Sequence, residues 1–317
     1  MKVVDRKVNA IIIYSFLLVY FKKINIYIKI FLCNICYNRV YILLNTKFNL
    51  RKIYSLFVIG LKHRGGIKMN IIKAEDYESM SRKAANIISA QVILYPNSVL
   101  GLATGSTPLG VYKQLIHIYN DRELDFSKVH SVNLDEYYGL SPDHNQSYHS
   151  YMKENFFKHI NMPSKNINIP NGLASNIDLE CSRYDKLISD FGGIDLQLLG
   201  IGHNGHIGFN EPGEVFEKNT HKVKLNKRTI DANSRFFNSI EEVPKYAITM
   251  GIKAIMQSKR ILLVVNGISK ADVLYEALLG AITPKVPASI LQLHPNLTVI
   301  ADKEALSILE KSRKFNL

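Results

Sequence analysis

A largely apolar run over residues 194–201 stops abruptly at Gly202. Two histidines, two asparagines and a glutamate follow before Pro212. A strand buried on both faces of a parallel sheet reads as such a near-continuous hydrophobic run. In open α/β sheets the ligand crevice lies just beyond the carboxyl ends of these strands. The sequence therefore predicts a parallel sheet, with the polar residues that follow residue 201 delivered into a site.

A second apolar run, over residues 99–103, ends in a short turn rich in glycine and hydroxyl groups. The turn consists of Thr104, Gly105, Ser106 and Thr107. Pro108 then stands at a plausible first position of a helix. Backbone N–H groups at such a helix start can bind an anion. No Gly-Lys-Ser/Thr follows, so the turn is not a Walker loop.

A third run, over residues 129–140, carries the adjacent acids Asp135 and Glu136. Successive side chains of a strand point to opposite faces, so only one of the two is expected to reach a common site. Asp135 and Glu136 compete for that role, and an acidic pair here could also be a helix cap or a solvated turn.

The two histidines of the glycine loop, His203 and His206, have two interpretations. As a metal pair they lack the cysteine or carboxylate cluster that would complete a ligand set. A histidine near a carboxylate is better suited to proton transfer near neutral pH. We therefore expect acid–base chemistry from His206, and no metal.

Apolar runs typical of strands alternate with helical periodicity along residues 69–317. This order predicts an α/β fold with a single doubly wound, mainly parallel sheet and helices on both faces, Rossmann-like in type. Residues 214–240 are expected to form a loop or lid with a short strand near 221–225. We expect one helix over residues 242–256, and Ser269 as the cap of a helix over 270–279.

The net charge of +13 is concentrated at one end of the chain. Residues 1–68 carry 13 Lys and Arg against the single acid Asp5, a net charge of +12, which leaves +1 for residues 69–317. The larger part therefore has no basic excess that would indicate a nucleic-acid partner.

Residues 1–68 form an atypical basic and apolar extension that we do not expect to belong to the native fold. Its longest uncharged run, residues 8–21, is shorter than the about 20 residues of a membrane span. We interpret Met69 as the true start of the protein, and a membrane-associating segment is the alternative. Three cysteines in 317 residues favour a reducing, cytoplasmic location over a disulfide scaffold.

Several motifs, in order, make residues 69 to about 302 resemble the glucosamine-6-phosphate deaminase (isomerase) family. They are residues 104–108, 134–137, 147–148, 205–212, 233–237, 243–247, 267–270 and 291–295. The resemblance implies conversion of glucosamine 6-phosphate and water to fructose 6-phosphate and ammonia, without a cofactor. It is compatible with a monomer or a homo-oligomer. The alternatives are a 6-phosphogluconolactonase-like hydrolase and a non-catalytic module that senses sugar phosphates.

The resemblance also implies roles for individual residues. Asp135 is the expected base for enolisation, and His206 with Glu211 is expected to open the sugar ring. Asn204 stands where some members have aspartate, and an amide there can only form hydrogen bonds. The phosphate would be bound by the turn of Thr104, Gly105, Ser106 and Thr107, together with Arg235 and Lys270.

Overall fold

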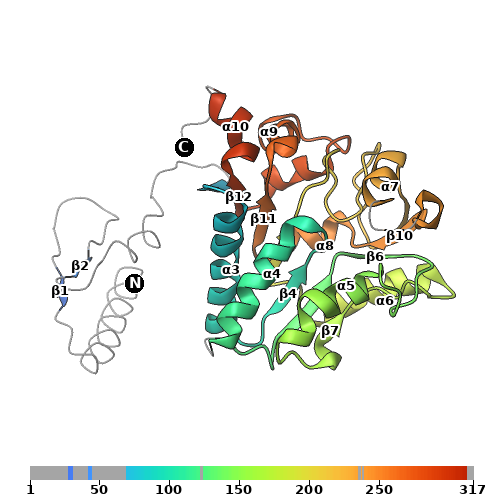
Figure 1. The fold of residues 1–317 in the computed structure, drawn as a ribbon, viewed down its shortest axis with the longest axis horizontal. Coiled ribbons are helices and arrows are strands. Elements are labelled where there is room, and N and C mark those ends of the chain that lie inside the picture. The colour runs from blue at the N-terminus through green and yellow to red at the C-terminus, as the bar shows by residue number, and fades with distance from the viewer. Residues whose placement is uncertain are drawn as a thin grey trace, which may run out of the picture. The chain divides into compact units, whose positions relative to one another are not determined.

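The computed structural model describes residues 28–30, 42–44, 69–121, 124–234, 237 and 239–312. The chain divides into two units, Met1–Arg64 and Gly65–Leu317 (Figure 1). In the first unit, strands β1 (Ile28–Ile30) and β2 (Ile42–Leu44) pair antiparallel, with Ile28 opposite Leu44. The rest of the extension that we set apart at residues 1–68 lies outside the described residues.

The second unit contains a sheet of seven strands, all paired in parallel. In spatial order these are β3 (Met69–Ala74), β12 (Leu297–Asp302), β11 (Ile261–Val265), β8 (Leu196–Leu199), β4 (Val99–Leu102), β5 (His130–Asn133) and β7 (Ile167–Asn168). The chain proceeds from β4 through β5 to β7, then returns to place β8 on the other side of β4. The direction of winding therefore reverses between β4 and β8, which confirms the predicted doubly wound, mainly parallel sheet.

The residues of β11 show why the sheet is covered on both faces. Ile261, Leu263 and Val265 point into one hydrophobic core, whereas Leu262 and Val264 point into a second. All five are buried, so this fully apolar strand supplies a layer to each core. In a strand with one face in solvent, apolar and polar residues would alternate along the sequence.

Helices from different parts of the chain complete the two cores. The core of Leu262 and Val264 is covered by α3 (Tyr77–Leu94), α4 (Ser106–Asn120) and α5 (Tyr148–Asn155). The core of Leu263 is covered by α6 (Ile177–Asp190), α8 (Ile252–Met256), α9 (Ala271–Leu279) and α10 (Lys303–Lys311). Figure 1 shows α3 and α4 side by side, and residues of both occupy the same core.

The segment 242–256, where we predicted one helix, forms a strand and a short helix instead. Strand β10 (Tyr246–Thr249) lies between β6 (Asp135–Tyr137) and β9 (His221–Lys224) in a three-stranded antiparallel sheet. Pro244 has no N–H for a helix interior, and Gly251 is the N-cap of α8. Pairing with strands distant in sequence prevails over the local helical periodicity of this segment.

Two further differences concern the ends of elements. Residues 69–74, which we did not predict as a strand, form β3 and pair with β12 at the edge of the large sheet. Ser269 does not cap a helix, because α9 begins at Ala271 after a 3₁₀ turn, η4 (Ile268–Lys270), and Lys270 is its N-cap. The predicted strand near 221–225 is confirmed as β9, and α7 (Lys227–Ser234) follows it unpredicted.

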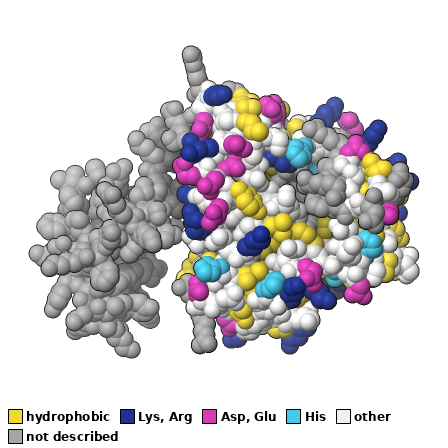
Figure 2. All heavy atoms as spheres, in the orientation of Figure 1, with side chains coloured by type: hydrophobic (Ala, Val, Ile, Leu, Met, Phe, Trp, Pro, Cys, Tyr) yellow, Lys and Arg dark blue, Asp and Glu magenta, His cyan; other side chains and the backbone are white. Residues whose placement is uncertain are grey.

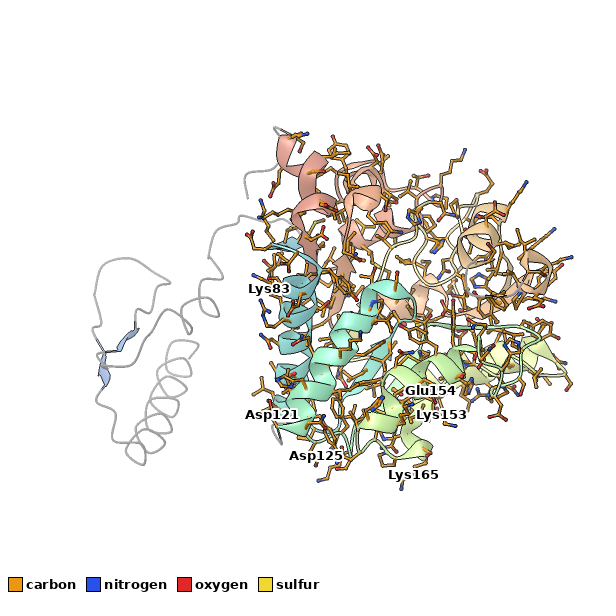
Figure 3. The ribbon with its side chains drawn as sticks, in the orientation of Figure 1. Lys83, Asp121, Asp125, Lys153, Glu154 and Lys165 are labelled. Atoms are coloured by element: carbon orange, nitrogen blue, oxygen red, sulfur yellow. The ribbon has the colours of Figure 1, made fainter. Side chains whose placement is uncertain are left out.

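The surface of the second unit carries charges of both signs. On the face seen in Figure 2, basic and acidic side chains are interspersed. Charged side chains such as Asp121, Asp125 and Lys165 lie near the end of α4 and the start of β5, on the amino-terminal side of the parallel strands (Figure 3). In the described part of the chain, every helix is too short or too polar to cross a membrane.

Candidate active site

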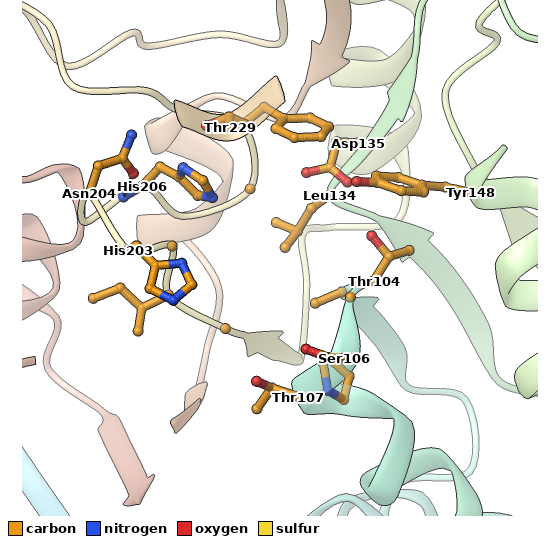
Figure 4. Close-up of a pocket in the computed structure, with 18 of the residues that line it drawn as sticks. Thr104, Ser106, Thr107, Leu134, Asp135, Tyr148, His203, Asn204, His206 and Thr229 are labelled. Carbon is orange, nitrogen blue, oxygen red and sulfur yellow. Dashed lines mark hydrogen bonds between the residues drawn. The ribbon is translucent and has the colours of Figure 1, made fainter. Parts of the chain in front are cut away.

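A pocket lies at the carboxyl ends of β4, β5, β8 and β11, where the winding of the sheet reverses (Figure 4). This is the position at which open α/β sheets bind ligands. Four loops contribute to its walls through residues 103–108, 134–135, most of 200–209 and Lys270, and Tyr148 and Thr229 complete the lining. The structure thus brings together all three loops that the sequence singled out.

One wall of the pocket is the turn between β4 and α4. Thr104, Gly105, Ser106 and Thr107 all line it, and α4 begins at Ser106 without a side-chain cap. Gly105 has φ of 101°, a region that favours glycine, and this lets the chain reverse directly from strand into helix. The uncapped first N–H groups of a helix attract anions.

Lys270 brings a cationic side chain to the pocket. It follows β11, lines the pocket, and donates from Nζ to the backbone oxygen of Ile201 at 2.7 Å. His203 also lines the pocket, with Nε2 3.4 Å from Oγ of Ser269. Arg235, which we predicted as a phosphate ligand, lies outside the described residues.

Asp135 and Glu136 are both buried, but their side chains lie in different surroundings. Asp135 lines the pocket, whereas Glu136 accepts hydrogen bonds from the backbone N–H groups of Tyr148 and His149 at the start of α5, at 2.8 and 2.9 Å. Glu136 also lies 2.9 Å from Nδ1 of His149. The alternation of β6 thus separates a pocket carboxyl group, Asp135, from one that fixes a helix.

The environment of Asp135 favours its neutral form. Burial raises the pKa of Asp135 well above its usual range, and the negative charge of Glu136 adds to the shift. Figure 4 shows the hydroxyl end of Tyr148 directed at Asp135, on the same side of the pocket, and burial raises the pKa of this hydroxyl as well. A carboxylate with a raised pKa is a stronger base once it has lost its proton.

His206 lines the side of the pocket opposite Asp135, and Glu211 lies next to its ring. Nδ1 of His206 lies 3.6 Å from Oε2 of Glu211, and both side chains are largely buried. Gly202 is required for this arrangement, because a Cβ atom there would lie 2.3 Å from Nε2 of His206. The glycine after β8 therefore makes room for the imidazole ring.

Glu211 is held by amide and hydroxyl donors. Nδ2 of Asn204 donates to Oε2 at 2.7 Å, Oγ1 of Thr229 donates to Oε1 at 2.5 Å, and Asn226 also donates to Oε2. Burial alone would raise the pKa of Glu211, but the His206 ring, Thr229 and Asn204 hold it below its usual value. The site thus contains one carboxyl group with a raised pKa and one with a lowered pKa, the pattern of paired acid and base roles.

Sequence reasoning missed three polar residues that build the site. Tyr148 was part of a quoted motif, yet it received no role, and Asn226 and Thr229 come from the polar segment 214–240. Thr229 lines the pocket from α7, and Asn226 also caps that helix by accepting from the Thr229 N–H at 2.8 Å. Their role becomes visible only in the fold, where the start of α7 lies next to Glu211.

The described residues include no group of three or more His, Cys, Asp or Glu side chains that could hold a metal ion. The ring nitrogens of His203 and His206 are therefore not accompanied there by a carboxylate or thiolate cluster.

The family described as glucosamine-6-phosphate isomerases/6-phosphogluconolactonases has a profile that matches residues 74–300. The chain belongs to this family. Among its relatives is a glucosamine-6-phosphate deaminase of Lachnoclostridium phytofermentans, 64% identical over 232 residues, which are 73% of this chain and 98% of that protein. A glucosamine-6-phosphate deaminase of Clostridium acetobutylicum is 59% identical over 241 residues, which are 76% of this chain and all of that protein (100%).

Solved structures of the family agree with the fold described above. A monomeric glucosamine-6-phosphate deaminase has a TM-score of 0.74 at 49% identity, covering 76% of this chain and 100% of that one. The 6-phosphogluconolactonase of Thermotoga maritima has a TM-score of 0.60 at 21% identity, covering 74% of this chain and 100% of that one. At that identity the second likeness concerns the fold alone.

Proposed function

We propose that the protein is a glucosamine-6-phosphate deaminase, which converts glucosamine 6-phosphate and water to fructose 6-phosphate and ammonia in amino-sugar catabolism. The observation that carries the proposal is the pocket in which Asp135 faces His206, whose ring lies next to Glu211, while the α4 turn and Lys270 complete the lining. The curated relatives named above, at 64% and 59% identity, support the same reaction.

Ring opening is the first step of the proposed reaction. His206 takes the proton of the anomeric hydroxyl and returns a proton to the ring oxygen, which breaks the C1–O5 bond and leaves an open-chain aldehyde. Glu211, held ionised by its donors, stabilises the charged imidazole ring that forms. Asn204 contributes by donating to Glu211, because an amide cannot exchange protons at neutral pH.

Enolisation follows at C2. Asp135 removes the C2 proton, the electron pair of that bond moves into a C1–C2 double bond, and the aldehyde oxygen takes up a proton from water to become an enol. Asp135 then returns its proton to C1, and the nitrogen lone pair forms a double bond to C2, which leaves a protonated imine there; its extra proton returns to water in the next step. Water adds to the imine and ammonia departs, so the atoms of glucosamine 6-phosphate and water are all accounted for.

The phosphate group is assigned to the wall opposite this chemistry. The backbone N–H groups at the start of α4, the hydroxyls of Thr104, Ser106 and Thr107, and the ammonium group of Lys270 supply donors and positive charge. Arg235 is proposed as a further phosphate ligand on sequence grounds, since its guanidinium group is suited to two phosphate oxygens.

A cytoplasmic location stays a prediction from the cysteine content.

The proposed function is tested by ammonia release. Purified protein should convert glucosamine 6-phosphate to equal amounts of ammonia and fructose 6-phosphate, without added metal or nucleotide. Hydrolysis of 6-phosphogluconolactone, measured in parallel, tests the other activity named in the family description. Lactone hydrolysis without ammonia release would replace the proposal with the hydrolase alternative. Saturable binding of glucosamine 6-phosphate without turnover would indicate a sensing module.

We also propose that residues 69–317 are the deaminase domain. About three quarters of this chain already match the full length of the relatives, and the division at Arg64 and Gly65 lies just before this domain. A protein of residues 69–317 is expected to remain soluble, to keep its melting temperature and to retain at least half of the ammonia release of the full chain. Loss of activity or precipitation on truncation would show that the domain depends on the preceding residues.

A further inference from the structure

Three tyrosines from three helices form hydrogen bonds with the backbone of the turn between β4 and α4. The hydroxyl of Tyr112 donates to the Ala103 oxygen at 2.5 Å, and that of Tyr151 donates to the Gly105 oxygen at 2.6 Å. Tyr77 donates to the Ser106 oxygen at 3.0 Å or to the Thr107 oxygen at 3.2 Å. Phenolic hydroxyls thus hold the carbonyl groups of Ala103 and Gly105, and that of Ser106 or Thr107.

Tyr151 fixes the orientation of the peptide unit between Gly105 and Ser106. The C=O and N–H of a trans peptide point in opposite directions, so the Ser106 N–H points away from Tyr151. This peptide unit rotates about ψ of Gly105 and φ of Ser106, and glycine, which has no Cβ atom, restricts the first of these torsions little. Without the Tyr151 bond, this peptide unit could rotate and exchange its donor for an acceptor. A carbonyl oxygen in that place would repel a phosphate.

Tyr77 has a corresponding role one residue further along. Its hydroxyl also accepts from the Gly110 N–H at 2.7 Å, so it bridges the Ser106 oxygen and the Gly110 N–H. These two groups are the pair that an α-helical hydrogen bond would join. Gly110 permits the approach, because a Cβ atom there would lie 2.9 Å from Cζ of Tyr77. The first residue of α3 thereby fixes the first turn of α4.

We propose that Tyr77 and Tyr151 are positioning residues for phosphate, which act by holding the N–H groups of the α4 turn toward the pocket. This inference rests on the proposed function, since it concerns the phosphate wall of the same site. Tyr112 differs from them because it is completely buried and stacks on Phe156 at 4.8 Å, so its hydroxyl serves the core as well. Tyr77 and Tyr151 are only half-buried and pack against the edge of that core.

The variants Tyr77→Phe and Tyr151→Phe test the proposal. Inorganic phosphate is titrated into the full-length protein by calorimetry, and its inhibition constant against glucosamine 6-phosphate is measured. Each variant is expected to bind phosphate about 3- to 10-fold more weakly, as the loss of one hydrogen bond implies. KM should rise by a similar factor, while kcat stays within about two-fold because the reacting carbons are not displaced. The matched control is Tyr95→Phe, an exposed tyrosine that follows α3, and it should leave the phosphate affinity unchanged.

Two results would overturn the proposal. One is an unchanged phosphate affinity in both variants. The other is a fall in kcat and melting temperature with no change in KM, which would mean that the two hydroxyls only stabilise the fold. The calorimetric titration requires no turnover, so it tests the positioning role even if the wild-type protein releases no ammonia from glucosamine 6-phosphate. Failure of that assay would contradict the proposed function separately.

Discussion

Asp135→Asn is expected to lower kcat about 10²- to 10⁴-fold, the usual contribution of a positioned acid–base group. The amide has nearly the same shape as the carboxyl group but cannot accept the C2 proton. Binding of a non-reacting analogue, glucosaminitol 6-phosphate, should therefore remain within a few-fold of the wild type. Steady-state ammonia release and calorimetric titration of the analogue measure the two effects. Turnover above about a tenth of the wild-type rate would remove Asp135 from the role of base.

The same substitution is expected to stabilise the fold. The pKa of Asp135 is raised by burial and by Glu136, whereas an aspartate in the unfolded chain has a pKa near 3.9. The folded protein therefore holds this proton more tightly than the unfolded chain, and the free energy of unfolding falls as pH rises from about 4 through the raised pKa. Asparagine removes this penalty. The melting temperature of Asp135→Asn should exceed that of the wild type, with a difference that grows over this pH range.

Two measurements separate this prediction from a general effect of acidic residues. Glu136→Gln should lower the melting temperature instead, because Glu136 accepts from two N–H groups at the start of α5. In the wild type, kcat/KM should fall at acid pH with an apparent pKa above the usual aspartate range, since the base must be ionised. An acid limb at the ordinary carboxyl pKa would contradict the raised pKa of Asp135.

The parallel sheet could be predicted because its signals are local. Apolar runs bounded by glycine or polar residues, such as residues 194–201 and 261–265, indicate strands that are buried on both faces. The antiparallel sheet could not be predicted in the same way. Residues 246–249 become a strand only because β6 and β9 stand on either side of them. Such pairing is set by the tertiary structure, so local helical periodicity misled the prediction for residues 242–256.

The candidate site shows the same division between local and distant information. Residues such as His206 and Thr104 follow the ends of predicted strands, and parallel strands deliver their carboxyl ends to one edge. The alternation of β6 also places Asp135 and Glu136 in different surroundings, as expected. The sequence does not reveal that Asn226 and Thr229 form hydrogen bonds with Glu211. These residues follow Glu211 by 15 and 18 positions, and no helical or strand periodicity and no motif connects them to it. The donors that lower the pKa of Glu211 therefore emerged only from the fold.

His206→Gln is expected to lower kcat about 10²-fold or more by slowing ring opening, the step for which the imidazole is proposed. Glutamine keeps a polar side chain beside Glu211 but cannot shuttle a proton. Substrate deuterated at C2 identifies the affected step. If C–H cleavage limits the wild type in part, its kcat shows an isotope effect. When ring opening becomes slower than every later step, that effect should fall to nearly one.

Asp135→Asn provides the contrast for this measurement, because it slows C–H cleavage itself and its residual turnover should keep the full isotope effect. His117→Gln, a change at an exposed histidine on α4, controls for the loss of an imidazole elsewhere. A full isotope effect in His206→Gln would place His206 at the C2 proton transfer instead of at ring opening. The two acid–base groups would then act on one step. The opposite pKa shifts of Asp135 and Glu211 argue for two steps, since each wall of the pocket favours a different protonation state.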